Sequence, residues 1–229
     1  MKRSIVTTVL LLTTVGLATP VKADYYDQVQ RLLLTGGCPR CNLSGAELRE
    51  AKLNNANLNN ADLIAALLEG ASLNNAYLVR ANLTDANLSG ASLTSANLWG
   101  ASLRGASLSG ANLSGADLTF AAFERATMSR ANLSGAKMRE AKLKGADLSG
   151  ANLSGVNLRQ AELKGVNLSG ANLTGANLTD VDLTDADLTG ADLSGANLKD
   201  ANMTNSKFKD VILCKTTGWN GKTSDRDCR

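Results

Sequence analysis

The 229-residue sequence predicts an all-β fold, a β-solenoid, from two features of one long repeat. A five-residue unit runs from Cys41 to Lys215 through 35 copies without an insertion or deletion. The central residue is Leu in 30 units and Phe or Met in the other five. The residue two positions earlier is Ala in 29 units, so two of every five positions are apolar and fixed.

The period of five excludes both regular elements. In an α-helix, five residues advance about 140° beyond one full turn, so the leucines would spread around the helix and form no buried face. In a straight strand, an odd period would place successive leucines on opposite faces. The chain must therefore bend in every unit, with Ala and Leu inward on a short extended piece that ends in a two-residue corner. The corner residues agree, because Ser or Thr is usually followed by Gly, Asn or Asp, which tolerate turn conformations.

Units such as Ala-Asn-Leu-Ser-Gly at 111–115 and Ala-Asp-Leu-Thr-Gly at 186–190 resemble the pentapeptide-repeat proteins, over about three quarters of the chain. The resemblance implies a right-handed quadrilateral β-helix with four units per coil, in which residues twenty apart stack. DNA mimicry that protects topoisomerases is an activity known in this family. Most exported members have no assigned biochemistry, so the resemblance implies a fold much more than a function.

The segment 1–23 has the features of a secretory signal. Lys2 and Arg3 precede an apolar run from Ile5 to Leu17, and Val21-Lys22-Ala23 offers small residues for cleavage before Asp24. The run is shorter than the roughly 20 apolar residues of a membrane span, so we expect no stable membrane insertion after cleavage. The sequence therefore predicts export, to the thylakoid lumen or the periplasm.

Removal of the signal makes the chain neutral. The full sequence has 24 basic and 21 acidic residues, and three of the basic ones (Lys2, Arg3 and Lys22) leave with the signal, so 21 of each remain. A neutral surface gives no electrostatic reason to bind a nucleic-acid backbone or to imitate one. A DNA-mimicking protector would be acidic, cytoplasmic and usually dimeric, and we expect a monomer here.

Both ends of a β-solenoid expose bare leucines and unpaired backbone, so caps are required. In the segment 24–40, helix-forming residues from Asp27 to Leu34 precede Gly36-Gly37, which predicts a short helix over the first coil. The segment 216–229 follows the repeat, and Trp219 is expected to cover the last leucines. This tail resembles the C-termini of exported pentapeptide-repeat proteins of the thylakoid lumen.

The four cysteines lie at the two ends of the repeat. In an exported protein, Cys38 with Cys41 and Cys214 with Cys228 are interpreted as two local disulfides. The alternative is a redox or metal-handling dithiol at Cys38 and Cys41. That chemistry needs an exposed thiol of low pKa, whereas Cys41 occupies an inward Ala position of the first unit.

The outward residues do not predict an enzyme. The sequence has no histidine, the commonest general base, and its serines are corner residues without a base partner. Asp182, Asp187 and Asp192 would point from three different faces, so they would not converge on a cation. We expect neither a cofactor nor a metal.

One patch departs from the small polar surface. With residues twenty apart stacked, aromatic and arginine side chains gather on one outward row and its adjoining corner, and this is the composition of interaction hot spots. Single exposed apolar residues are normal, which is the alternative explanation. The sequence thus favours a non-enzymatic scaffold with an unknown protein partner. The candidate patch comprises Tyr77, Val79, Arg80, Trp99, Phe120, Arg139 and Arg159.

Overall fold

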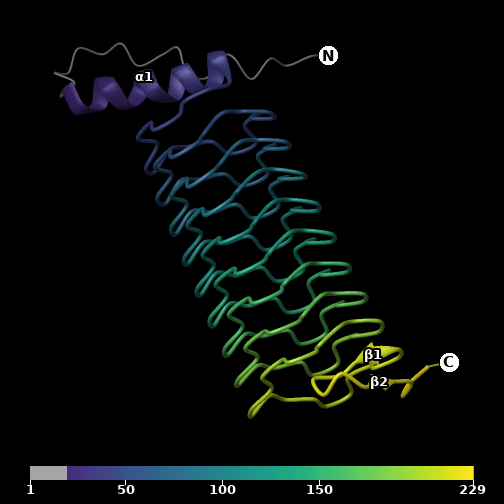
Figure 1. Ribbon diagram of the computed structural model, residues 1–229. Coiled ribbons are helices and arrows are strands. Elements are labelled where there is room, and N and C mark those ends of the chain that lie inside the picture. The colour runs from purple at the N-terminus through teal and green to yellow at the C-terminus, as the bar shows by residue number, and fades with distance from the viewer. Residues whose placement is uncertain (1–19, 229) are drawn as a thin grey trace.

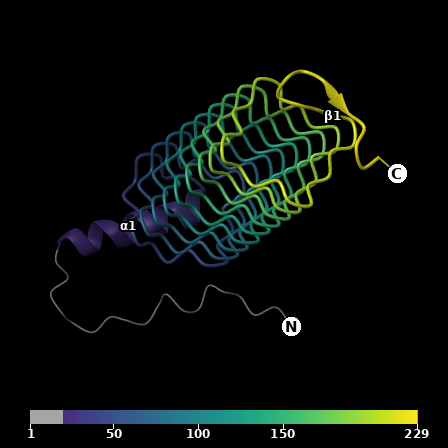
Figure 2. The same ribbon diagram turned by 90° about the horizontal axis from the view of Figure 1, so that it is seen from below.

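The computed structural model describes the backbone of residues 20–228 and the side chains of residues 27–228. Stacked coils form a rod with helix α1 (Pro20–Thr35) at one end. At the other end, strands β1 (Thr216–Thr217) and β2 (Thr223–Ser224) form a small antiparallel hairpin (Figure 1). A view turned by 90° shows the coils following one another in register along the rod (Figure 2). The predicted signal lies outside the described residues up to position 19.

Parallel bridges connect residues twenty apart throughout the rod, from Gly37↔Asn57 to Asn197↔Thr217. In each bridge the outward residue of one unit pairs with its equivalent one coil later. Two backbone hydrogen bonds make each bridge. At Asn132, the N–H donates to the Ala111 carbonyl at 2.9 Å and the carbonyl accepts the Leu113 N–H at 2.7 Å. The expectation of four units per coil, with residues twenty apart stacked, is therefore confirmed.

The interior is a continuous apolar column. Leu and Ala of the repeat are buried along its length, apart from Ala51 near the first coil and the residues of the last coil, which are partly buried. Phe123, Met128 and Met138 replace Leu at 0 % exposure, so the column also accepts Phe and Met in the central position. Burial of this kind stabilises each coil through its neighbours, as in other repeat proteins.

Every corner ends in a residue with positive φ. In the unit that contains Leu113, Gly115 has a φ of 65°, and the N–H of Ala116 donates to the Leu113 carbonyl at 3.1 Å. The outward Asn112 completes the turn, because its Oδ1 accepts the backbone N–H of Ser114 at 3.1 Å. The same contact recurs in many units, which explains the preference for Asn or Asp at this position. The repeat pattern alone predicts only that this position is polar.

Helix α1 begins at Pro20, seven residues before the predicted start at Asp27. Proline is common in the first helical turn, where its missing N–H would have no intrahelical acceptor in any case. Because the helix begins at Pro20, it includes the predicted cleavage point after Ala23. It ends at Thr35, just before Gly36 as expected. The φ of Gly36 is 70°, and its N–H donates to the Leu32 carbonyl at 2.9 Å. Leu32 is fully buried against the first coil.

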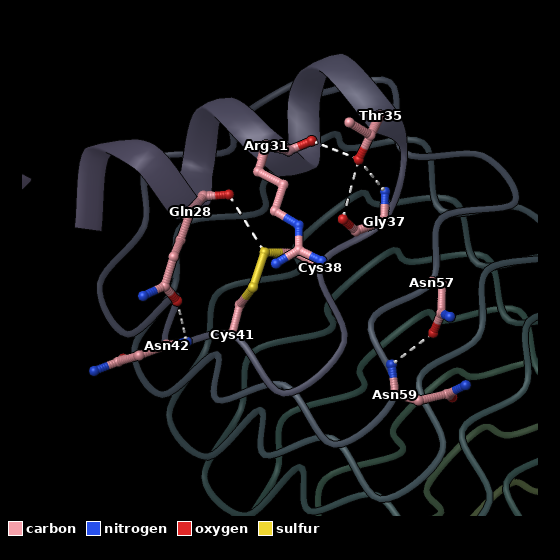
Figure 3. Close-up of a disulfide and its surroundings, with 9 residues drawn as sticks. All are labelled: Gln28, Arg31, Thr35, Gly37, Cys38, Cys41, Asn42, Asn57 and Asn59. Carbon is pink, nitrogen blue, oxygen red and sulfur yellow. Dashed lines mark hydrogen bonds between the residues drawn. A yellow bond between two sulfur atoms is a disulfide. The ribbon is translucent and has the colours of Figure 1, made fainter. Parts of the chain in front are cut away.

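The N-terminal disulfide lies directly beneath α1. Cys38 and Cys41 are joined with a Cα–Cα distance of 5.4 Å, and both are buried. The Cys38 sulfur lies 3.4 Å from the Gln28 carbonyl oxygen (Figure 3). The Gln28 side chain accepts the Asn42 N–H at 2.6 Å, so the helix satisfies one backbone donor of the first coil.

The second disulfide joins Cys214 to Cys228 and holds the hairpin against the last coil. Thr216 is buried, and its hydroxyl donates to the Leu193 carbonyl at 2.7 Å. Trp219 nevertheless remains 58 % exposed, and Met203 and Phe208 are only partly buried. The expectation that Trp219 covers the last leucines is thus met only in part, because the short tail reaches only part of the coil.

Among residues 20–228, no helix combines the length and the apolar character needed to cross a bilayer.

Candidate interaction surface

Trp99 is the centre of the aromatic patch, which we define as Tyr77, Val79, Arg80, Trp99 and Phe120. Trp99 takes the first corner position of its unit, a position that Ser or Thr usually fills. An indole does not fit the interior at this position, so the side chain lies outward over the rod. The Asn97 Oδ1 accepts the Trp99 backbone N–H at 3.1 Å, so the turn itself is the ordinary one.

Neighbouring coils place one side chain on each side of the indole. The Phe120 ring, from the following coil, meets Trp99 edge to face at a centroid distance of 5.5 Å and an interplanar angle of 77°. The Arg80 Cζ, from the preceding coil, lies 5.2 Å from the Trp99 ring centroid. Both geometries are favourable for aromatic and cation–π contacts. The sequence-based prediction that these three residues adjoin therefore agrees with the structure.

Gly100 leaves the space that this stack needs. It occupies the corner between Arg80 and Phe120 in the same column, and its φ is 64°. A β-carbon built on Gly100 would lie 3.6 Å from Cγ of Arg80, so the arginine stem runs close over the glycine. A longer side chain at position 100 would compete with Arg80 for the indole face.

Phe120 is an unusual choice for its backbone position. Its φ is 60°, in the left-handed region that Gly, Asn and Asp enter most readily, and its side chain is 43 % exposed. Arg80 and Glu140 have nearly the same φ at their corners, so the exposed aromatic ring, and not the backbone conformation, distinguishes Phe120. Burial in the core does not account for Phe120, because its ring lies outside the coil.

Tyr77 and Val79 extend the patch on the side of the preceding coil. Tyr77 is 52 % exposed and bridges to Asn97, the residue whose side chain holds the Trp99 turn. The Val79 N–H donates to Asn59 Oδ1 at 2.9 Å, and its side chain is half-buried beside that row. Together with Trp99 and Phe120 they give the patch an apolar surface bordered by Arg80.

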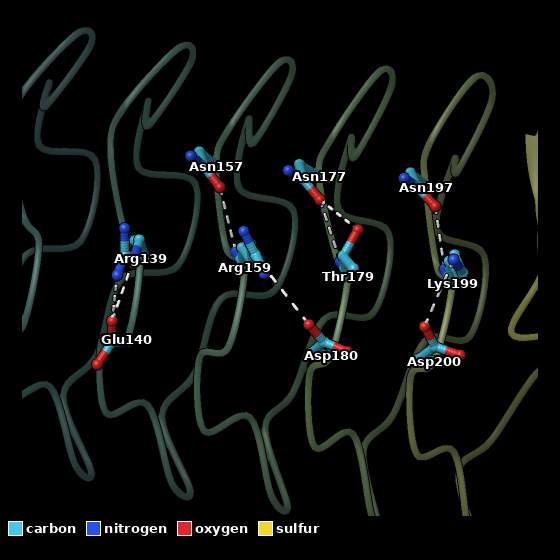
Figure 4. Close-up of polar contacts among 10 residues, drawn as sticks. All are labelled: Arg139, Glu140, Asn157, Arg159, Asn177, Thr179, Asp180, Asn197, Lys199 and Asp200. Carbon is cyan, nitrogen blue, oxygen red and sulfur yellow. Dashed lines mark hydrogen bonds and ion pairs between the residues drawn. The ribbon is translucent and has the colours of Figure 1, made fainter.

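Arg139 and Arg159 belong to a different environment. Arg139 pairs with Glu140 at 2.9 Å, and Arg159 lies 3.7 Å from Asp180 in the next coil (Figure 4). Both arginine side chains are about half exposed, and each has a carboxylate beside it. The structure therefore splits the predicted set into the aromatic patch and a charged row farther along the same face.

The aspartates near the C-terminal end are separately engaged. Asp180 pairs with Arg159, Asp187 lies 3.0 Å from Lys207, and Asp182 accepts the Thr184 backbone N–H at 3.0 Å. Hydrogen bonds from Thr184 lower the pKa of Asp182. No group of three or more potential metal ligands occurs in the part of the chain that the structure describes.

The dithiol alternative gains no support from the geometry. Cys38 and Cys41 form a disulfide, and their exposed fractions are 0 % and 6 %. Helix α1 lies over Cys38, whose sulfur faces the Gln28 carbonyl (Figure 3). Thiol exchange needs in-line access to a sulfur atom, and this burial denies it.

Comparison with known proteins identifies the repeat. A family model for pentapeptide repeats matches eight copies in overlapping segments that run from residue 41 to residue 214. The chain belongs to the pentapeptide-repeat family. Pentapeptide-repeat proteins fold as right-handed β-helices and are in general non-enzymatic, which agrees with the coils described above. A search of curated proteins finds no match.

Solved structures extend this comparison. HetL, from the cyanobacterium Nostoc sp. strain PCC 7120 and involved in heterocyst differentiation regulation, is 32 % identical, covers 86 % of this chain and 98 % of its own, and has a TM-score of 0.58. A pentapeptide-repeat protein of the Arabidopsis thaliana thylakoid lumen is 32 % identical over 44 % of this chain and 63 % of its own, with a TM-score of 0.21. The plasmid-mediated fluoroquinolone resistance protein QnrB1 is 20 % identical over 62 % of this chain and 82 % of its own, with a TM-score of 0.43. The likeness to HetL supports the fold along most of this pentapeptide-repeat chain.

Proposed function

We propose that this pentapeptide-repeat protein is a non-enzymatic scaffold that works after export and binds a protein partner through the aromatic patch. The observation that carries the proposal is the stack of Arg80, Trp99 and Phe120 on an otherwise small and polar surface. Tryptophan, tyrosine and arginine are the residues most enriched among interaction hot spots. Phe120 also places an exposed aromatic ring at a corner position that Gly, Asn or Asp occupies in most units.

The patch is suited to a protein more than to a nucleic acid. Its charge comes from Arg80 alone, and the arginines farther along the face have carboxylate neighbours. Binding to the phosphate backbone of DNA or RNA needs several unpaired basic side chains along one line on the protein surface. The partner is accordingly a protein with an apolar contact and a carboxylate or carbonyl group for Arg80. We propose that the scaffold acts as a monomer.

The proposal of export rests on the signal-like segment and the cysteines. Two disulfides at the ends of the rod suit an oxidising compartment, such as the thylakoid lumen or the periplasm. We expect the full chain to yield an exported product that begins at Asp24 and has both disulfides closed. Intact-mass measurement of the exported fraction tests this, and a product that retains residues 1–23 would refute cleavage.

The partner site is tested by affinity capture from the exported fraction. The mature protein is used as bait beside a variant with Trp99→Ser and Phe120→Ser. A control variant carries Ser109→Ala and Ser129→Ala on the opposite side of the coil, where the two hydroxyls contact each other at 3.2 Å. Circular dichroism establishes that all three are folded. A partner retained by parent and control but lost by the aromatic variant supports the proposal, and equal capture by all three refutes it.

A further inference from the structure

Within the described part of the chain, the last complete coil has unpaired backbone groups on two of its four sides. In the coil before it, the Leu188 N–H donates to the Lys207 carbonyl at 3.0 Å, and the Lys207 N–H donates to the Ala186 carbonyl at 2.9 Å. By the same register, the N–H groups of Met203 and Phe208 point to where a following coil would lie. Within residues 20–228 these two N–H groups have no acceptor, and the carbonyls of Ala201 and Ser206 have no donor.

The C-terminal tail closes the other two sides. The Leu198 N–H donates to the Thr217 carbonyl at 2.8 Å on one side. On the other, Arg226 donates to the Val211 carbonyl at 3.2 Å and Asp227 accepts the Leu213 N–H at 3.3 Å. The open edge is therefore confined to residues 201–210, a stretch of two repeat units. The hairpin marks this end of the rod, opposite α1 (Figure 1).

An apolar hollow lies beside the open edge. It measures about 570 Å³ and is lined by Met203, Phe208, Leu213 and Trp219, with Arg226 at its border. A second hollow of about 330 Å³ shares three of these residues and includes Lys222. Elsewhere in the rod, the following coil places two large apolar side chains over the equivalent positions. The last coil has no following coil, so the hollow occupies the space that such side chains would fill. We call the open edge and the larger hollow the C-terminal notch.

The charges around the notch favour an acidic occupant. Lys222 and Arg226 line the hollows, and no Asp or Glu is among the lining residues in the described part of the chain. Arg226 pairs with Asp227 at 3.0 Å, so the charge available to an occupant comes mainly from Lys222. Lys207 lies on the open edge with its side chain 72 % exposed, and it already pairs with Asp187 of the coil beneath it at 3.0 Å. A carboxylate stacked on the other side of Lys207 would continue this alternation.

We propose that the C-terminal notch binds an extended, acidic peptide segment of a protein partner by strand addition. The segment supplies two parallel backbone pairings, one over Asn202 and one over Lys207. Each pairing residue donates its N–H to Ala201 or Ser206 and accepts from Met203 or Phe208. The following residue of each pair is a large apolar one that fills the hollow. Strand addition of this kind draws affinity from the backbone and specificity from alternate side chains.

The probe is a fluorescent ten-residue peptide, Ala-Asp-Leu-Thr-Gly-Ala-Asp-Leu-Ser-Gly, which copies residues 186–195. Its two Asp residues take the pairing positions and its two Leu residues enter the hollow. We expect saturable binding to the mature protein by fluorescence polarisation. A peptide N-methylated at both Asp residues loses the donors to Ala201 and Ser206, and its affinity should fall at least tenfold. A peptide N-methylated at both Leu residues is the matched control, because those N–H groups point away from the rod.

A protein variant provides a second test. Phe208→Asp places a carboxylate in the hollow and should weaken peptide binding at least tenfold, with circular dichroism to establish the fold. The peptide comparison on the unchanged protein remains decisive if this variant unfolds. The Trp99→Ser, Phe120→Ser protein should bind the peptide like the parent, which separates this inference from the proposed function.

Three results would overturn the proposal. They are the absence of saturable binding, equal affinity of the two N-methylated peptides, and a dimer in sedimentation that Phe208→Asp converts to a monomer. The last result would assign the notch to a second copy of the chain. A monomeric parent that discriminates between the two peptides supports strand addition.

Discussion

At the level of single residues, the aromatic patch depends on two corner positions that differ from the rest of the repeat. Phe120 places a large ring where most corners have Gly, Asn or Asp, and Gly100 leaves room beside it for Arg80. The two corners have nearly the same φ, so the backbone alone does not distinguish them. The difference lies in the side chains, which together enclose the Trp99 indole.

Gly100→Asn tests this arrangement. Asparagine tolerates the left-handed conformation, so we expect the free energy of unfolding to fall by less than about 1 kcal/mol. The new side chain should displace Arg80 and change the near-UV circular dichroism of Trp99. Gly110→Asn is the control, because a β-carbon there meets nothing within 4 Å. A near-UV spectrum that changes equally in both variants would contradict the spatial role of Gly100.

At the level of elements, α1 joins the rod through the buried Leu32, the partly buried Val29 and two polar contacts of Gln28. Leu32 is fully buried in the core cluster, whereas Leu34, two residues later, is 80 % exposed. Gln28 accepts the Asn42 N–H and so satisfies a donor of the first coil. The helix thus covers the apolar end of the column and part of its backbone edge.

Leu32→Ala should destabilise the protein by about 2–4 kcal/mol, because it removes buried apolar volume between the helix and the first coil. Leu34→Ala is the matched control and should change stability by less than about 0.5 kcal/mol. Chemical denaturation followed by circular dichroism measures both. Equal effects would show that α1 does not dock on the column through Leu32.

Asp187 gives the last coils a dependence on pH. Hydrogen bonds from the Thr189 hydroxyl and backbone N–H, and then from Lys207, lower the pKa of Asp187 from 3.8 to about 2. A carboxyl whose pKa is lower in the folded state contributes stability above its unfolded pKa, and this is lost as the pH falls through the folded value. The contribution should therefore disappear between about pH 4 and pH 2, and salt should weaken it.

Asp187→Asn should remove this dependence. Between pH 4 and pH 2, the melting temperature of the parent should fall more than that of the variant, while above pH 5 the variant should be the less stable protein. An NMR titration of the Asp187 carboxyl reports its pKa directly. A titration midpoint near 3.8 would contradict the lowered pKa.

At the level of the whole molecule, the rod is a one-dimensional array in which each coil contacts only its neighbours. The column of Leu and Ala is continuous from the first coil to the last, and the backbone ladder runs the same length. A defect in the middle therefore affects both halves. A defect at the C-terminal end affects one coil that is already partly open.

Leu133→Asp places an unpaired carboxylate in the dry interior of a middle coil, where Leu133 has 0 % exposure. We expect a loss of at least about 3 kcal/mol and unfolding of the central coils, seen as a lower and broader thermal transition. Asn132→Asp, one residue earlier and outward, should melt like the parent because Asp is common at this position. A parent-like melt of Leu133→Asp would refute the assignment of Leu133 to the core.

The five-residue period is sufficient to predict a solenoid with Leu and Ala inside, because no helix or straight strand accommodates an odd, fixed apolar period. The number of units per coil followed from the family resemblance, and stacking at twenty residues then brought Arg80, Trp99 and Phe120 together. The sequence did not reveal that Arg139 and Arg159 pair with Glu140 and Asp180, because ion pairs between neighbouring corners depend on rotamers.

The arrangement of the chain at the two ends of the rod could be established only from the tertiary structure. Helix α1 begins at Pro20, so its first turn consists of residues 20–23, which the composition assigned to the signal segment. At the other end, only the path of the tail decides which backbone groups it satisfies. Within residues 20–228, that path leaves the backbone N–H groups of Met203 and Phe208 without acceptors and Trp219 exposed, since a disulfide-held hairpin of this length spans two sides of a four-sided coil. Local periodicity specifies the repeat, whereas the unpaired ends depend on contacts between segments that follow no repeat.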